Sequence, residues 1–152
     1  MRNRPLGHTL AVGLVAAVAL VFACVKKGDP IRETLDAVVK AANARDVEAL
    51  LDNVATDFEA ADGTGRLDTK LRLEQYFSAY EILNVSVSDV QIERGDKAAF
   101  VRLRASMSGQ PRKIGGLEGL VPSSAKYDFE LRLIQEGKAW KLAWAAWAPV
   151  GD

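Results

Sequence analysis

The sequence predicts an α+β domain in which helices come first and an antiparallel sheet follows. Three features carry this prediction. Apolar residues recur every three or four positions across residues 31–42, which is the spacing of an amphipathic helix. From Leu83 onward the apolar period changes to two, the spacing of β-strands. Residues 125–148 read as two alternating strands around a turn at Gly137–Lys138, and both are rich in aromatic or aliphatic side chains.

Residues 1–23 precede this domain and read as a secretory signal peptide. Arg2 and Arg4 give a positive start, and residues 10–23 form an uncharged apolar run. This run is too short to cross ~30 Å of hydrocarbon comfortably as a helix. Cys24, the only cysteine, follows directly after the small residue Ala23. The arrangement resembles the lipobox of bacterial lipoproteins, in which the cysteine is lipidated and becomes the new N-terminus.

The lipobox resemblance implies that residues 24–29 form a short lipidated tether and that the chain contacts a membrane through Cys24. Each buried CH₂ of an acyl chain contributes ~0.8 kcal/mol to anchoring. No Asp follows the cysteine, since Val25 and Lys26 come next. By analogy with lipoprotein sorting, this implies the outer membrane of a diderm cell envelope, facing the periplasm. The alternative is an uncleaved N-terminal anchor with an incidental cysteine.

The composition of the remaining chain excludes several functions. After cleavage, 152 − 23 = 129 residues remain with a net charge of 18 − 20 = −2, because Arg2 and Arg4 are removed. A near-neutral domain lacks the excess of positive charge that nucleic-acid binding requires. The only histidine, His8, lies in the signal peptide. Ser–His or Cys–His catalysis and His/Cys zinc sites are therefore excluded, and we expect no metal and no cofactor.

Two helices should open domain 30–152. Asp29 can accept hydrogen bonds from the free N–H groups at the start of the first helix, and Pro30 fits its first turn. This helix should end near residues 43–45. Asp46 should cap a second, shorter helix, whose apolar stripe ends at Val54.

A short strand at residues 58–61 and a third helix should follow, with Asp68 or Thr69 as the N-cap of the helix. The apolar stripe of this helix is Leu73, Tyr76, Phe77 and Tyr80.

The strand region contains a predicted bulge and a predicted turn. The alternation slips at Ser88–Asp89, which predicts a β-bulge, and Gly95–Asp96 predicts a two-residue hairpin turn. The next strand should cover residues 97–108, and a long loop at 110–124 should lead to the last hairpin. The apolar face that results comprises Ala99, Val101, Leu103, Ala105, Met107, Tyr127, Phe129, Leu131, Leu133, Trp140, Leu142, Trp144 and Ala146.

The element order and two segments resemble the nuclear transport factor 2-like superfamily, which includes SnoaL-like polyketide cyclases, ketosteroid isomerase and scytalone dehydratase. The segments are GKAWKLAWAAW at residues 137–147 and ARDVEALLDNVATDF at residues 44–58. The resemblance implies a cone-shaped α+β roll, in which a curved antiparallel sheet wraps three N-terminal helices and a cavity opens at one end. Fold alone does not transfer an activity.

Enzymes of this superfamily place an Asp, His or Tyr inside the cone, yet the predicted inner faces carry no acid. The nearest carboxylates are Asp57, Glu59 and Asp62, and the first two are weak catalytic candidates together with Tyr76 and Tyr80. The simpler interpretation of all three acids is a solvated loop or helix end. Tyr76, Tyr80, Tyr127 and Trp144 could instead line a cavity for a small apolar ligand, or simply be core.

The opposite sheet face should carry Phe100, Ile134 and Trp147 among mixed charges. This group suggests an interface for a homodimer or an envelope protein, although scattered surface apolar residues are common. The preferred function is a non-catalytic ligand- or protein-binding domain. The alternatives are a hydratase, isomerase or cyclase of SnoaL-like type, and an envelope assembly factor that docks through this face.

Overall fold

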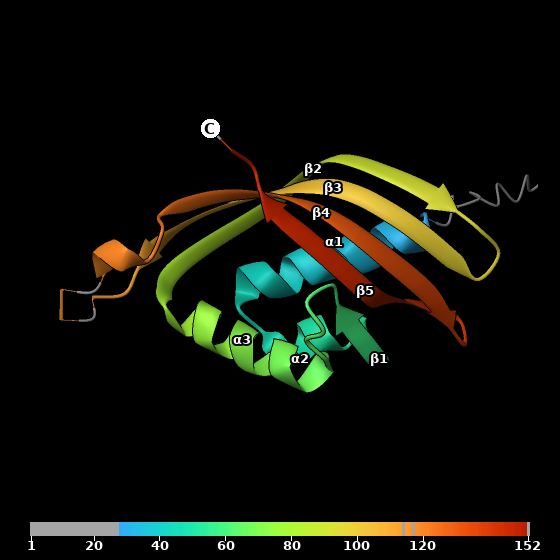
Figure 1. Ribbon diagram of the computed structural model, residues 1–152, viewed down its shortest axis with the longest axis horizontal. Coiled ribbons are helices and arrows are strands. Elements are labelled where there is room, and N and C mark those ends of the chain that lie inside the picture. The colour runs from blue at the N-terminus through green and yellow to red at the C-terminus, as the bar shows by residue number, and fades with distance from the viewer. Residues whose placement is uncertain (1–27, 114, 117, 152) are drawn as a thin grey trace, which may run out of the picture.

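Helix α1, Pro30–Ala44, is the first element of the computed structural model, which describes residues 28–113, 115–116 and 118–151 (Figure 1). The predicted start is confirmed, because the Asp29 carboxylate accepts a hydrogen bond from the Ile31 N–H at 3.0 Å. The helix ends at Arg45, whose backbone adopts the left-handed conformation at φ 55°. The signal segment and Cys24 lie outside the described residues.

Helix α2, Val47–Leu51, and strand β1, Val54–Ala60, follow at once. Asp46 caps α2 as predicted and accepts from the Ala49 N–H at 2.9 Å. The prediction of Val54 as the end of this helix is wrong, and the strand starts four residues before the predicted 58–61. Val54 is paired with Leu142 in a neighbouring strand, so tertiary pairing overrides the local helical period.

Helix α3 covers Arg66–Ser78 and begins at Gly65, which offers no side-chain cap. The predicted caps Asp68 and Thr69 are therefore wrong. Asp68 instead lies in the first turn, where a negative charge favours the helix dipole. Tyr80 was predicted on the helical stripe but is the first residue of strand β2, Tyr80–Arg94.

The sheet has the strand order β1-β5-β4-β3-β2. Its remaining strands are β3 (Ala98–Pro111), β4 (Ser124–Glu136) and β5 (Ala139–Pro149), with a 3₁₀ turn at Glu118–Leu120 between β3 and β4. All neighbouring strands are antiparallel except β1 and β5.

In the β2–β3 hairpin, the predicted bulge is present but the turn differs from the prediction. The predicted bulge is confirmed, since the β2–β3 register shifts between Ser88 and Gln91 and Asp89 has φ 53°. The hairpin turn is wider than predicted, because β2 ends at Arg94 and β3 begins at Ala98.

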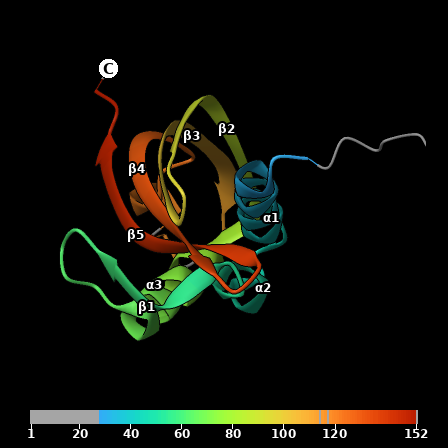
Figure 2. The ribbon, with the colours of Figure 1, turned by 90° about the vertical axis from the view of Figure 1, so that its right-hand side faces the viewer.

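The sheet curls until the free edge of β2 lies along α1, which closes the roll (Figures 1 and 2). The Asn43 side-chain amide donates to the Val85 carbonyl at 2.9 Å and accepts from the Val85 N–H at 2.7 Å. Arg45 donates to the Tyr80 carbonyl, and Arg94 pairs with Asp29. An edge strand exposes unpaired backbone groups, and these contacts occupy several of them.

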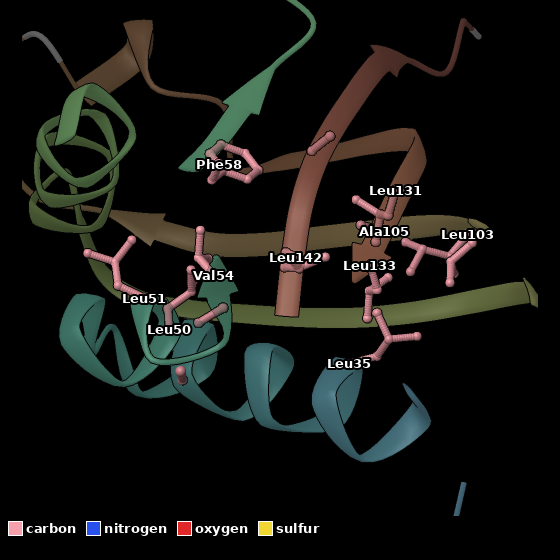
Figure 3. Packing of buried hydrophobic residues seen from close by; sticks show 14 of the residues in the cluster. Leu35, Leu50, Leu51, Val54, Phe58, Leu103, Ala105, Leu131, Leu133 and Leu142 are labelled. Carbon is pink, nitrogen blue, oxygen red and sulfur yellow. The ribbon is translucent and has the colours of Figure 1, made fainter. Parts of the chain in front are cut away.

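The core fills the space between the sheet and the helices. Leu35 of α1 lies beneath Leu133 of β4, and Leu133 is fully buried (Figure 3). Among the described residues, the buried apolar cluster runs from Ile31 to Ala145. The predicted α+β arrangement is confirmed. Among the described helices, none has the length and apolar character needed to cross a membrane.

An aromatic candidate site on the inner face of the sheet

The inner face of the sheet, which faces the helices, carries the apolar residues that alternation predicts for β3 and β4. Val101, Leu103, Leu131 and Leu133 are buried there. Cross-strand pairing places Ala105 opposite Tyr127 and Leu103 opposite Phe129, so both aromatic residues lie on this face. All inner positions of β3 and β4 are uncharged: Ala99, Val101, Leu103, Ala105, Met107, Ala125, Tyr127, Phe129, Leu131 and Leu133.

All three tyrosines of the chain gather at one end of this face. Tyr76 comes from α3, Tyr80 from the start of β2, and Tyr127 from β4. The Tyr76 and Tyr80 ring centroids lie 5.2 Å apart. Burial, together with the neighbouring Tyr80 and Tyr127, raises the pKa of the Tyr76 phenol above its ordinary value. Tyr76 therefore stays protonated at neutral pH and acts as a hydrogen-bonding group rather than as a base.

The hydroxyls of Tyr76 and Tyr80 have different partners. The Tyr80 hydroxyl donates to the Pro122 carbonyl at 2.7 Å, whereas the Tyr76 hydroxyl lies 3.4 Å from the Met107 sulfur, a weak acceptor. The space between these residues is too small for a water molecule. There is therefore no room for a ligand between Tyr76, Tyr80 and Met107.

From Tyr127 an aromatic strip continues across the sheet through Phe129 and Trp147. Tyr127 and Phe129 pack edge to face with centroids 6.4 Å apart, and Phe129 and Trp147 are tilted by 31° at 6.0 Å. Tyr127 and Phe129 are half-buried, and Trp147 is 47% exposed. We call these three residues the aromatic strip. It is the open part of an otherwise packed face.

The sequence-based prediction assigned Trp144 and Trp147 to the wrong faces. The β4–β5 register shifts by one residue between the pairs Leu133–Leu142 and Arg132–Trp144. A one-residue slip reverses the face of every residue beyond it. Trp144 therefore lies on the outer face beside Arg132, while Trp147 pairs with Phe129 on the inner face. The predicted inner position of Ala146 is likewise wrong, because Ala145 is the buried residue opposite Leu131.

The candidate acids do not join the tyrosines. Asp57 and Glu59 lie on β1, where both are exposed and flank the buried Phe58. Glu59 pairs with Trp144, at the opposite edge of the sheet from β2 and its Tyr80. The structure therefore places neither predicted general base at the aromatic site. In the described ranges, no group of three or more His, Cys, Asp or Glu side chains could hold a metal ion.

On the outer face, Phe100 is 57% exposed and Ile134 is half-buried. Phe100 of β3, Arg132 of β4 and Trp144 of β5 are cross-strand partners in one row. Trp144, rather than the predicted Trp147, is thus the aromatic residue of β5 that accompanies Phe100.

No family model matches the chain, and no curated protein matches it significantly. Several solved structures share its fold. A candidate scytalone dehydratase from Novosphingobium aromaticivorans aligns over 80% of this chain and 83% of its own, with a TM-score of 0.68 and 15% identity. A candidate dehydratase of the NTF2-like family from Streptomyces avermitilis aligns over 81% and 96%, with a TM-score of 0.68 and 15% identity.

The third structure, Bd1075 from Bdellovibrio bacteriovorus, aligns over 79% of this chain with a TM-score of 0.66 and 15% identity. This chain spans only 40% of the length of Bd1075. At these identities the likeness concerns the fold alone. The three helices and the curved, mostly antiparallel five-stranded sheet are a nuclear transport factor 2-like fold.

Proposed function

We propose that this protein is a lipid-anchored, non-catalytic envelope domain that binds a small, uncharged apolar ligand on the aromatic strip. The observation that carries the proposal is the strip itself. Three aromatic rings are left partly open on a sheet face whose β3 and β4 positions are all uncharged. Burying a charged ligand there would have a large desolvation cost, whereas an apolar ligand gains from burial.

The geometry supports a flat apolar ligand. Aromatic side chains prefer offset or edge-to-face partners with centroids 4.5–7 Å apart, a range that Phe129 and Trp147 already satisfy with each other. The space beside the Tyr76 hydroxyl is too small for a water molecule, so the ligand would contact the exposed rings and not this hydroxyl.

The hydratase, isomerase or cyclase alternative has less support. Two structural neighbours are candidate dehydratases, but a shared fold hosts many functions. Asp57 and Glu59, the acids expected to act as base, are exposed on β1.

Native mass spectrometry of the full-length chain, released gently from detergent after expression in a bacterial envelope, tests the binding proposal. We expect an extra small mass that disappears on denaturation and identifies the chemical class of the ligand. Trp147→Ser should lose this mass, whereas Trp144→Ser, on the outer face, should keep it. A wild-type protein without any added mass, and without affinity for added apolar compounds, would contradict the proposal.

The lipid anchor is part of the proposal and is tested separately. The support is the position of Cys24 directly after a short apolar segment and Ala23. Intact-mass measurement should show a chain that starts at Cys24 and carries acyl groups. Cys24→Ala should abolish the acyl mass and release the protein from the membrane fraction. A wild-type chain that retains residues 1–23 would favour the uncleaved anchor instead.

A second candidate function is docking of an envelope protein or a second copy on the outer face. The exposed Phe100 beside Arg132 and Trp144, with Ile134 in the neighbouring row, favours it. Aromatic and Arg side chains are enriched at the centres of interfaces. Phe100→Asp should abolish association in analytical ultracentrifugation, while Ile82→Asp, which alters another exposed apolar residue, should not. Equal association of both variants would reject this function.

A further inference from the structure

We infer that the chain has a second binding site, on the outer face of the sheet and adjoining the Tyr127 end of the aromatic strip, for a small hydroxylated ligand that carries one anionic group. The site is a hollow at the end of the sheet, formed by β2, β3, β4 and residues 149–151. We call it the serine hollow.

Strand register places two rows of hydroxyl and amide side chains side by side. Asn84, Ser108 and Ser124 form one row across β2, β3 and β4. Ser86, Ser106 and Lys126 form the next row, two residues along each strand. Both rows alternate with the inner-face residues of the same strands, so they lie on the outer face.

These residues line an open hollow of about 780 Å³, which Val85, Met107, Ala125 and Tyr127 of the same strands also border. Known small-molecule sites span ~300–1,000 Å³. The segment Pro149–Gly151 forms another wall, and the Val150 N–H fixes it by donating to the Lys126 carbonyl at 2.9 Å. The hollow is therefore large enough for a sugar-sized molecule.

The polar groups of the serine hollow are available to a ligand. In the described part of the chain, no protein group forms a hydrogen bond with the side-chain hydroxyls of Ser86, Ser106, Ser108 or Ser124. Hydroxyls can both donate and accept. Several of them on adjacent strands match a ligand that carries several hydroxyls of its own.

Lys126 gives the hollow its charge preference. Among the described residues that line the hollow, it is the only charged one, and its ammonium group forms no ion pair with any of the described residues. In the next row, Arg104 already bonds both carboxylate oxygens of Asp128, at 2.8 and 3.2 Å. That pair is neutral overall, so Lys126 is the cation without an ion pair among the described residues that line the hollow. A carboxylate or phosphate on the ligand would pair with it.

Amide chemical shifts of the ¹⁵N-labelled full-length chain in detergent micelles test this inference. Titrations with glucuronate, glucose 6-phosphate and glucose compare a carboxylate, a phosphate and no charge on similar rings. We expect at least one anionic sugar to shift amides in 84–86, 106–108 and 124–127, with an affinity about fivefold above that of glucose. The stronger of the two anionic probes identifies the anionic group.

Lys126→Gln should remove the preference for the anionic sugar, and Lys138→Gln, an exposed lysine in the β4–β5 turn, should retain it. Both residues lie on the surface, so the overall spectrum reports whether each variant is folded. The inference is overturned if no sugar shifts the hollow amides at millimolar concentration, or if Lys126→Gln and Lys138→Gln behave alike. Trp147 is not among the residues that line the hollow, so Trp147→Ser, which tests the aromatic strip, should leave these shifts unchanged.

Discussion

At the scale of single residues, the inner face depends on a few side chains that are removed from water. Leu133 is fully buried, with 0% solvent exposure, and packs with Leu35 from α1 (Figure 3). Leu133→Ala should lower the free energy of unfolding by about 2–5 kcal/mol, because it removes buried methyl groups and leaves a cavity. Urea denaturation measures this. Leu67→Ala, at 70% exposure, should change stability by less than ~0.5 kcal/mol.

Asp62 links stability to pH. Hydrogen bonds from Thr64 and from Arg72 hold the pKa of its carboxyl at about 2. A folded-state pKa below the unfolded value contributes stability that is fully present above about pH 4 and is lost as the pH falls towards 2. Asp62→Asn should therefore lose less stability than the wild type over this range. Denaturation at several pH values checks this, with Asp96→Asn as the control. An unchanged slope for Asp62→Asn would contradict it.

Single-residue predictions from the sequence succeeded where the cause was local. Asp29 and Asp46 were identified as N-caps because the capping bond spans only two or three residues. The tryptophan faces depended instead on the phase of a whole strand. The run Ala143–Ala146 is apolar at every position, so it contains no alternation that could reveal the register shift.

At the scale of elements, α1 and β2 are joined through the Asn43 side chain. Asn43→Ala should speed hydrogen exchange of the Val85 amide, because that N–H loses its acceptor at 2.7 Å. Asn43→Asp keeps an acceptor and should protect this amide better than Asn43→Ala. The cost of Asn43→Ala in unfolding free energy should be about 1 kcal/mol, since the residue is exposed. Equal exchange in both variants would show that Asn43 does not hold this edge.

The segment 121–124 is held over the tyrosine end of the inner face. The Tyr80 hydroxyl donates to the Pro122 carbonyl, and the Gly109 N–H donates to the Ser123 carbonyl at 2.8 Å. Tyr80→Phe should destabilise this segment by about 1 kcal/mol and speed exchange of the Gly109 amide. Tyr76→Phe should have a smaller effect, because the Tyr76 hydroxyl contacts the Met107 sulfur and Tyr80 and does not bond this segment. The reverse ranking would contradict this description.

Elements were predictable where the hydrophobic period was long or broke clearly. The bulge at Ser88–Asp89 was visible as a change of phase within β2. Strand β1 was harder to predict, because α2 is only five residues long and the apolar spacing of the helix continues to Val54 in the strand. Its parallel pairing with β5 joins residues far apart in the sequence, so no local pattern marks it.

At the scale of the whole molecule, the order of helices and strands was enough to predict the α+β roll, and the comparisons show the nuclear transport factor 2-like fold. The candidate site was only partly predictable. Three of the four predicted cavity residues, Tyr76, Tyr80 and Tyr127, come together from α3, β2 and β4. The fourth, Trp144, lies on the other face, and Trp147 takes its place through the register shift.

The most direct measurement of the central claim is a fluorescence titration of the full-length chain with the neutral apolar probe N-phenyl-1-naphthylamine. The aromatic strip predicts saturable binding that Trp147→Ser weakens about tenfold, equivalent to ~1.4 kcal/mol. Trp144→Ser should bind like the wild type, because Trp144 lies on the outer face. Equal weakening by both substitutions, or no saturable binding in the wild type, would contradict the claim that the inner aromatic strip is a ligand site.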